Sequence, residues 1–190
     1  SWNMKNYASL QIKKIKNEVG SDKVLIGLSG GVDSAVVAKI LDEAVGSQLI
    51  CIFVDTGLLR MNEASDVMSV FSGRLKGIVK KIDASKLFFK ALTGITDPEE
   101  KRKIVGKLFI EIFEKEASNF GDVKWLAQGT IYPDVVESAG NIGSVAKKIK
   151  SHHNVGGLPA RLSLKLLEPL RNLFKDEVRR LGITLGLEHQ

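Results

Sequence analysis

Hydrophobic positions follow two patterns along the chain, short apolar runs and longer stretches with a period of three to four residues. The short runs predict strands at 24–28, 49–54, 78–82, 125–128 and 165–167. The longer stretches predict helices at 10–19, 35–45, 63–71, 85–92 and 99–119, and a last one around 173–181. Every position of 49–54 is apolar, which is typical of a strand buried on both faces of a parallel sheet. The alternation predicts an α/β fold, an open, doubly wound parallel sheet with ligands at the carboxyl ends of its strands.

The segment 29–34, Ser-Gly-Gly-Val-Asp-Ser, joins the first predicted strand to a helix. Adjacent glycines let the backbone turn sharply, so that successive N–H groups can point at one anion. The helix start that follows favours the same anion through its amides and its dipole. A simple strand-to-helix turn is the alternative. We expect a phosphate-binding loop, with all six residues in contact with the ligand: Ser29, Gly30, Gly31, Val32, Asp33 and Ser34.

The side chains of this loop predict further roles. The hydroxyls of Ser29 and Ser34 add hydrogen-bond donors for phosphate. Asp33 and Ser34 lie where a helix cap is expected. Asp33 is also the best candidate for a metal ligand, because Mg²⁺ is held by few carboxylates together with phosphate oxygens.

The composition is that of one ordinary globular domain. The chain has 190 residues, of which 44% are hydrophobic, and its mean hydropathy is close to zero. Its single cysteine, Cys51, excludes an internal disulfide, a cysteine-based zinc site and a Cys-x-x-Cys pair, and its apolar surroundings predict core packing. No apolar run approaches the ~18 residues of a membrane span, and the start lacks a signal-peptide pattern. We expect a cytoplasmic protein that does not bind membranes.

The net charge of +6 favours a site for polyanionic small molecules. Nucleic acid is the rival explanation for this charge. Against it, Lys13, Lys14, Lys16, Lys80 and Lys81 are scattered among acidic residues, and no aromatic residues are interleaved with them. We therefore expect no nucleic-acid partner.

Five blocks of sequence resemble a known family. The loop 29–34 has neither the Walker A pattern nor Gly-x-Gly-x-x-Gly, and its Ser-Gly-Gly-x-Asp-Ser resembles the pyrophosphate loop of the N-type ATP pyrophosphatases. Four further blocks resemble the synthetase domain of the GMP synthases, in order and across essentially the whole chain: 54–60, 95–106, 126–138 and 149–159. The resemblance implies the adenine nucleotide alpha hydrolase-like, Rossmann-like fold. It also implies an enzyme that uses ATP and Mg²⁺.

The resemblance implies a carbon–nitrogen ligase reaction. ATP adenylates the C2 oxygen of XMP and pyrophosphate leaves, then ammonia displaces AMP and GMP is formed. Positioning and charge neutralisation suffice for this chemistry, so no covalent nucleophile is expected. In the family, the strand end at Asp55 lies against adenosine, although a turn residue is an equally good interpretation of Asp55. Gly129 and Thr130 are expected to approach the ribose and the α-phosphate closely, because glycine has no side chain.

The block 97–103 has two interpretations. Asp97-Pro98 predicts a helix start, and a charge run at such a place is by itself typical of a solvated helix face. The family has a mobile lid here, in which Arg102 would grip the XMP phosphate with its planar fork of donors. Asp97 and Glu100 are candidates for metal or adenylation chemistry. The resemblance assigns Lys150, in a glycine-rich loop, to the departing pyrophosphate.

The resemblance also implies further domains and leaves three alternative functions. The family takes ammonia from a glutaminase domain or subunit, and dimerises through a C-terminal domain that also completes the XMP site. Neither domain is found in residues 1–190, so we expect an excised ATP pyrophosphatase domain of a protein that is a homodimer at full length. The alternatives are an NAD synthetase, a tRNA-thiolating enzyme, and a module that binds ATP without turnover. The lone Cys51 argues against thiolation, which usually needs catalytic cysteines.

Overall fold

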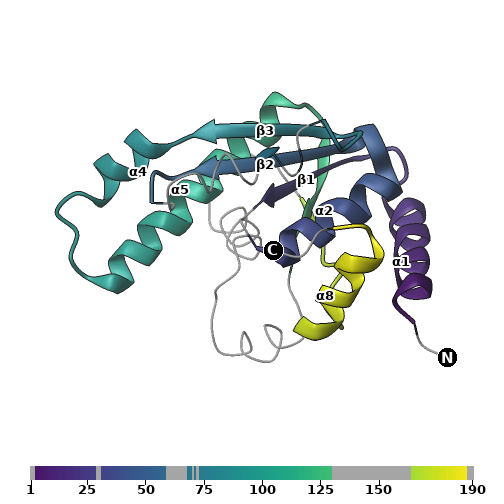
Figure 1. Ribbon diagram of the computed structural model, residues 1–190. Helices are drawn as coiled ribbons and strands as arrows, with labels where there is room; N and C mark the ends of the chain where they lie inside the picture. Colours follow the sequence, from purple (N-terminus) through teal and green to yellow (C-terminus); the bar gives the residue numbers. More distant parts are fainter. Residues whose placement is uncertain are drawn as a thin grey trace.

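A parallel sheet forms the centre of the molecule. The computed structural model describes residues 3–28, 31–58, 68–69, 71, 73–129 and 164–187 (Figure 1). Within these ranges the strands are β1 (Lys23–Leu28), β2 (Leu49–Asp55), β3 (Ile78–Asp83), β4 (Val123–Ala127) and β5 (Lys165–Leu167). Their order is β3-β2-β1-β4-β5, and each neighbouring pair is parallel. The predicted doubly wound parallel sheet is confirmed.

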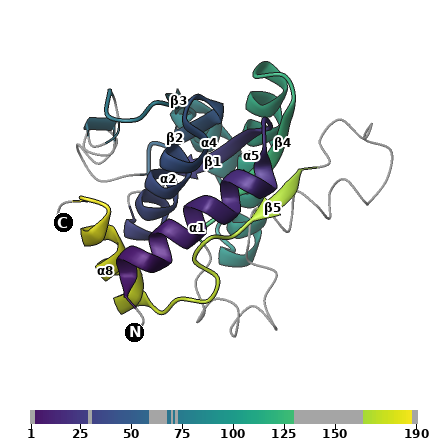
Figure 2. The ribbon, with the colours of Figure 1, turned by 90° about the vertical axis from the view of Figure 1, so that its right-hand side faces the viewer.

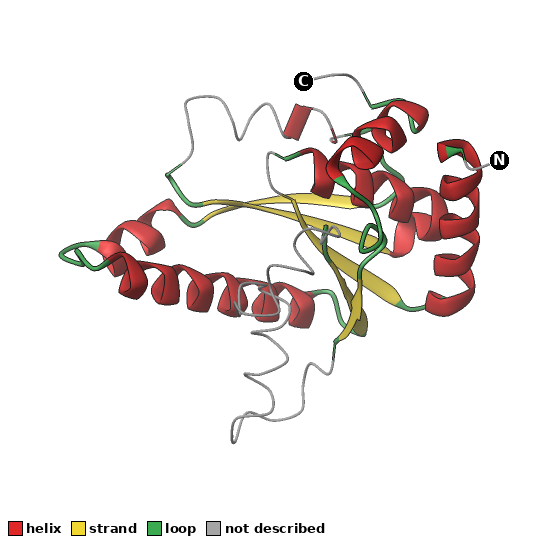
Figure 3. Ribbon diagram, turned by 90° about the horizontal axis from the view of Figure 1, so that it is seen from below, coloured by secondary structure: helices red, strands yellow, loops and turns green. Residues whose placement is uncertain are grey.

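Helices cover both faces of the sheet. One face carries α1 (Met4–Val19), α2 (Val32–Val45) and α8 (Lys175–Thr184), which lie side by side in Figure 2. The other face carries α4 (Ser85–Leu92) and α5 (Pro98–Asn119), and Figure 3 shows the sheet between the two layers. A short 3-10 helix, Gly46–Gln48, connects α2 to β2.

Each helical layer encloses its own hydrophobic cluster. Alternate residues of a strand point to opposite faces, so Val24 and Ile26 pack beneath α1, α2 and α8, whereas Leu25 packs beneath α4 and α5. In β2 every residue except the terminal Asp55 is buried, as the continuous apolar run predicts. Strands buried on both faces thus join the two clusters into one domain.

Cys51 lies within the central sheet and is fully buried. Burial, and secondarily the nearby Asp42 carboxylate, raises the pKa of the Cys51 thiol to about 12. The thiol is therefore protonated at physiological pH and acts as a small hydrophobic side chain. The predicted packing role is confirmed.

Two polar contacts hold helices in place, one on each face of the sheet. The Tyr7 hydroxyl on α1 donates a buried hydrogen bond to the Pro169 carbonyl at 2.9 Å, which fixes α1 to the connection between β5 and α8. Burial, and secondarily Glu177, raises the pKa of the Tyr7 phenol. On the opposite face, Lys80 Nζ of β3 lies 2.8 Å from Glu116 Oε2 of α5. This ion pair ties the edge strand to the long helix.

Most predicted elements match the structure within a few residues. The helix predicted from residue 35 begins earlier, at Val32. Asp97 caps α5 as predicted, its side chain accepting a hydrogen bond from the Glu99 amide at 3.3 Å. Most of the helix predicted at 63–71 lies outside the described residues. Within those residues, no helix is both long and apolar enough to cross a membrane.

Adjacent phenylalanines on α4 test how much the second cluster contributes to stability. Phe88 is 0% exposed, and its ring packs edge-to-face against Phe109 at 5.4 Å, whereas Phe89 is 77% exposed. We expect Phe88→Ala to lower the free energy of unfolding by ~3–5 kcal/mol, because it leaves a cavity. Phe89→Ala is expected to change it by less than ~0.5 kcal/mol. Urea unfolding followed by circular dichroism measures both, and equal losses would contradict the assigned burial.

Candidate functional site

The strand order defines one place for a ligand. β2 and β3 lie to one side of β1, and β4 and β5 lie to the other, so the winding reverses between β1 and β4. Open parallel sheets bind ligands beyond the carboxyl ends of the strands at this switch point. Here the ends are Leu28 of β1 and Ala127 of β4, and α2 starts directly beyond them, at Val32. The candidate site is therefore the start of α2 together with the end of β4.

The start of α2 is built to receive an anion. Gly31 occupies the cap position in an extended conformation, and no side chain forms a capping hydrogen bond. The first amides of a helix have no acceptor within the helix, so a bound anion can take that place. The prediction that Asp33 or Ser34 caps the helix is wrong. Both lie within the first turn because helical geometry already begins at Val32, and the Ser34 hydroxyl lies 3.3 Å from the Gly31 carbonyl oxygen.

Gly129 brings the end of β4 against this first turn. A Cβ atom added at Gly129 would lie 3.1 Å from Asp33 Cβ, 3.3 Å from the Asp33 carbonyl carbon and 3.4 Å from the Ser34 amide nitrogen. A side chain at this position would therefore push β4 and α2 apart. The close approach expected at Gly129 is thus seen toward α2, and its approach to a nucleotide stays a prediction.

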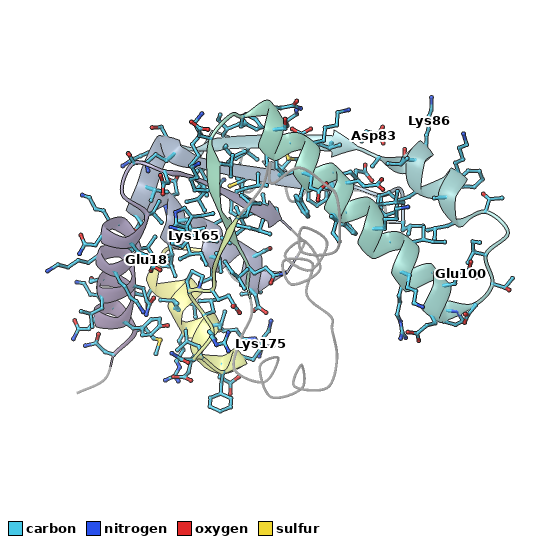
Figure 4. All side chains as sticks on the ribbon, turned by 180° about the vertical axis from the view of Figure 1, so that it is seen from behind. Glu18, Asp83, Lys86, Glu100, Lys165 and Lys175 are labelled. Carbon is cyan, nitrogen blue, oxygen red and sulfur yellow. The ribbon has the colours of Figure 1, made fainter. Side chains whose placement is uncertain are left out.

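Lys175 lies in the candidate site, and sequence reasoning missed it. It is the first residue of α8, and its Nζ lies 2.7 Å from Asp33 Oδ1, a contact between residues 142 positions apart. Figure 4 shows Lys175 at one end of α8. A cation in the first turn opposes the helix dipole. A lysine at a predicted helix start, directly before the acidic residues Asp176 and Glu177, is therefore the sequence feature that could have indicated a role for Lys175.

Local contacts leave the Lys175 side chain directed toward α2. The Glu177 carboxylate accepts a hydrogen bond from the Phe174 amide at 3.1 Å, so the start of α8 is capped by a residue of its own first turn. The ammonium of Lys175 is then available to Asp33. This pair places a positive and a negative charge, both partly exposed, at the start of α2.

Asp55 ends β2 at the same edge of the sheet and takes part in a turn. Its Oδ1 accepts a hydrogen bond from the Gly57 amide at 2.9 Å, and its carbonyl accepts one from the Ala84 amide at 2.8 Å. Its Oδ2 lies 3.8 Å from Lys81 Nζ. The turn interpretation of Asp55 is confirmed, and the proximity to adenosine stays a prediction.

The neighbouring end of β3 forms a second polar turn. Asp83 accepts hydrogen bonds from the Ser85 hydroxyl at 2.6 Å and from the Ser85 amide at 3.0 Å. These bonds are the main reason that the pKa of the exposed Asp83 carboxyl is lowered. Local hydrogen bonds account for Asp83, so it needs no ligand to explain it.

The charged block predicted as a lid lies on a separate part of the molecule. We call residues 85–103, from the start of α4 to the first turns of α5, the α4–α5 arm. The arm extends beyond the carboxyl end of β3 in Figure 1, and Figure 4 shows Glu100 far from Lys175. Asp97, Glu100 and Arg102 are all exposed on it. The structure does not bring these three residues to the start of α2.

Four predicted site residues lie outside the described part of the chain: Ser29, Gly30, Thr130 and Lys150. Among the described residues, no three His, Cys, Asp or Glu side chains come together as a metal site would require. One carboxylate with phosphate oxygens is nevertheless a usual environment for Mg²⁺. Asp33 at the start of α2 fits that arrangement.

Comparisons with known proteins agree with this architecture. The family described as NAD synthase matches residues 4–91. The chain is 63% identical over 188 residues to the glutamine-hydrolysing GMP synthase of Francisella philomiragia, and 62% identical over 188 residues to that of Francisella tularensis subsp. novicida. These matches cover 99% of this chain but 36% of each relative, so the chain spans about a third of their length.

Solved structures show how widely the fold is shared. An NH3-dependent NAD synthetase from Campylobacter jejuni superposes with a TM-score of 0.74 at 16% identity, covering 98% of this chain and 75% of that one. The U34-tRNA thiolase NcsA from Methanococcus maripaludis superposes with a TM-score of 0.63 at 21% identity, covering 97% of this chain and 66% of that one. At such identities the likeness establishes the fold alone. Over 99% of its length the chain is thus similar to a region of the glutamine-hydrolysing GMP synthases, and residues 4–91 match the NAD synthase family.

Proposed function

We propose that this chain carries out the synthetase half-reactions of a GMP synthase. The C2 oxygen of XMP attacks the α-phosphorus of ATP, and the bond to the β-phosphate breaks, releasing pyrophosphate. Ammonia then attacks C2, and AMP departs with the oxygen, leaving GMP. The observation that carries the proposal is the 63% identity over 99% of the chain to a glutamine-hydrolysing GMP synthase.

The start of α2 is the proposed site of the ATP phosphates. Its amides and dipole favour the negative charge, and Ser29 and Gly30, which the sequence predicts to contact phosphate, are proposed to bind it as well. The Lys175 ammonium, 2.7 Å from Asp33, neutralises part of the pyrophosphate charge as it develops. Asp33 would hold the Mg²⁺ that accompanies ATP, and the ion would supply charge neutralisation at the phosphates. Adenosine lies toward Asp55 at the end of β2, and Gly129 and Thr130 lie beside the ribose and α-phosphate.

The α4–α5 arm is proposed to bind the acceptor, XMP, and we call it the acceptor clamp. Arg102 binds the XMP phosphate, and Asp97 and Glu100 assist adenylation, while Lys150 binds the departing pyrophosphate. Because Glu100 lies far from Lys175 in Figure 4, the arm must move toward the start of α2 for these groups to act together. The long exposed side chains at the start of α5 are compatible with that motion.

The remaining parts of the reaction are proposed to come from outside these 190 residues. The relatives named as glutamine-hydrolysing are nearly three times as long as the matched region. We propose that a glutaminase domain or subunit supplies ammonia, and that a C-terminal domain completes the XMP site and a homodimer. The proposed setting is purine nucleotide biosynthesis in the cytoplasm.

The direct test is pyrophosphate release from Mg-ATP and ammonium with XMP, with deamido-NAD, or with no acceptor. It is made on the protein as the cell produces it and on the 190-residue chain. We expect XMP-dependent formation of pyrophosphate and AMP in the former. Turnover with deamido-NAD alone would instead establish an NAD synthetase, and ATP binding without any turnover would establish a binding module.

Lys175 and Lys80 form a matched pair for testing the phosphate site. Their ion pairs with Asp33 and Glu116 measure 2.7 and 2.8 Å, and their side chains are 44% and 42% exposed. Lys175→Gln is expected to raise the KM for ATP about 10- to 100-fold, because a hydrogen bond to a charged group contributes ~1.5–3 kcal/mol. Lys80→Gln is expected to lower stability and leave that KM unchanged. Equal effects of both changes on KM would remove Lys175 from the site.

Arg102 tests the acceptor clamp. Arg102→Ala is expected to raise the KM for XMP about 10- to 100-fold with little change in the KM for ATP, because only the acceptor phosphate loses its charge-assisted hydrogen bonds. Lys107→Ala, on the same helix at a 73% exposed side chain, is the control and should change neither KM. Steady-state pyrophosphate release measures all four values. A rise in the KM for ATP alone would assign Arg102 to the other substrate.

A further inference from the structure

Gln128 holds a buried hydrogen-bond acceptor that no other described residue satisfies. Its side-chain Oε1 is inaccessible to solvent and has no hydrogen-bond partner within the described part of the chain. Its backbone is well placed, since the Gln128 amide donates to the Leu167 carbonyl at 2.9 Å and so extends the pairing of β4 with β5. The unsatisfied atom is thus held at the end of β4, at the switch point of the sheet.

The Gln128 side chain points away from the phosphate site. Trp125 and Ala127 belong to the cluster beneath α2, and Leu126 belongs to the cluster beneath α5. Gly129 continues this alternation because it faces Asp33 of α2. Gln128, between Ala127 and Gly129, therefore faces the α5 side.

An aromatic ring of α5 covers β1 on this side of the sheet. On the neighbouring strand, Gly27 faces the same side, and a Cβ added there would lie 2.6 Å from Phe113 Cζ. The Phe113 ring thus covers β1 beside the end of β4. Amides in such places are normally hydrogen-bonded, and an apolar side chain of equal size would avoid the cost of burying one. A polar residue that breaks this rule indicates a donor from outside the described residues, and a ligand at this edge of the sheet can supply one.

The Gln128 residue as a whole is only half-buried, and we propose that its amide turns so that Oε1 accepts a hydrogen bond from the acceptor nucleotide and helps to select it. The inference rests on the proposed function, and deepens it by assigning a residue to the acceptor. Gln128 and Gly129 face opposite sides of the sheet, although their Cα atoms are only about 3.8 Å apart. The acceptor and the ATP phosphates therefore bind on opposite sides of the same strand end. Arg102 comes from α5, the helix on the Gln128 side. The ligand class is a purine nucleotide that presents a ring N–H or a ribose hydroxyl.

The test compares Gln128→Met with Gln48→Met in the protein as the cell produces it. Gln48 is the matched control, because its Nε2 donates structural hydrogen bonds to the carbonyls of Gly20 and Asp22 at 2.8 and 2.7 Å. For Gln128→Met we expect an unfolding temperature without ligands that is unchanged or higher, and a KM for XMP raised about 10-fold at an unchanged KM for ATP. For Gln48→Met we expect a lower unfolding temperature and both KM values unchanged.

Several outcomes would overturn the inference. A lower unfolding temperature for Gln128→Met with an unchanged KM for XMP would show that the amide serves the fold. A rise in the KM for ATP alone would assign it to the other nucleotide. If the unsubstituted protein releases no pyrophosphate in response to XMP, the proposed function fails first, and the inference fails with it.

Discussion

The pairing of β1 on both sides, with β2 on one and β4 on the other, is the constraint from which the remaining architecture follows. Parallel strands end at the same edge, so this pairing gathers the ends of three strands next to the start of α2. Helices cover both faces of β1, so its residues divide between the two clusters. Gly129 and Lys175 meet Asp33 only because these strand ends and α8 are held at this edge.

The sequence predicts those parts of the structure that short stretches determine. The apolar run 49–54 forms a strand, Asp97 caps the long helix, and the adjacent glycines precede the start of α2. A sharp helix boundary was harder to predict. Asp33 and Ser34 have the side chains of a cap, yet the backbone enters helical geometry two positions earlier than Ser34, and Gly31 takes the cap position.

Contacts between distant segments could not be predicted in the same way. The Lys175 to Asp33 pair joins residues 142 positions apart, and no local pattern specifies that α8 lies beside α2. Gln128 is part of a block that resembles the GMP synthases, but only the folded structure shows that its Oε1 is buried and that the alternation of β4 turns it toward the α5 side. The resemblance supplied the expected roles of Arg102 and Glu100, and the structure adds that they lie on the α4–α5 arm, away from Lys175.

Cys51 has a consequence for the chemistry of the molecule in oxidising conditions. It is the single cysteine of the sequence, it is fully buried in the strand beside β1, and its thiol has a pKa raised to about 12. Thiol oxidation and disulfide exchange proceed through the exposed thiolate. Covalent pairing of two copies through sulfur therefore requires the central sheet to open, and the folded chain is insulated from changes in the redox state of its surroundings.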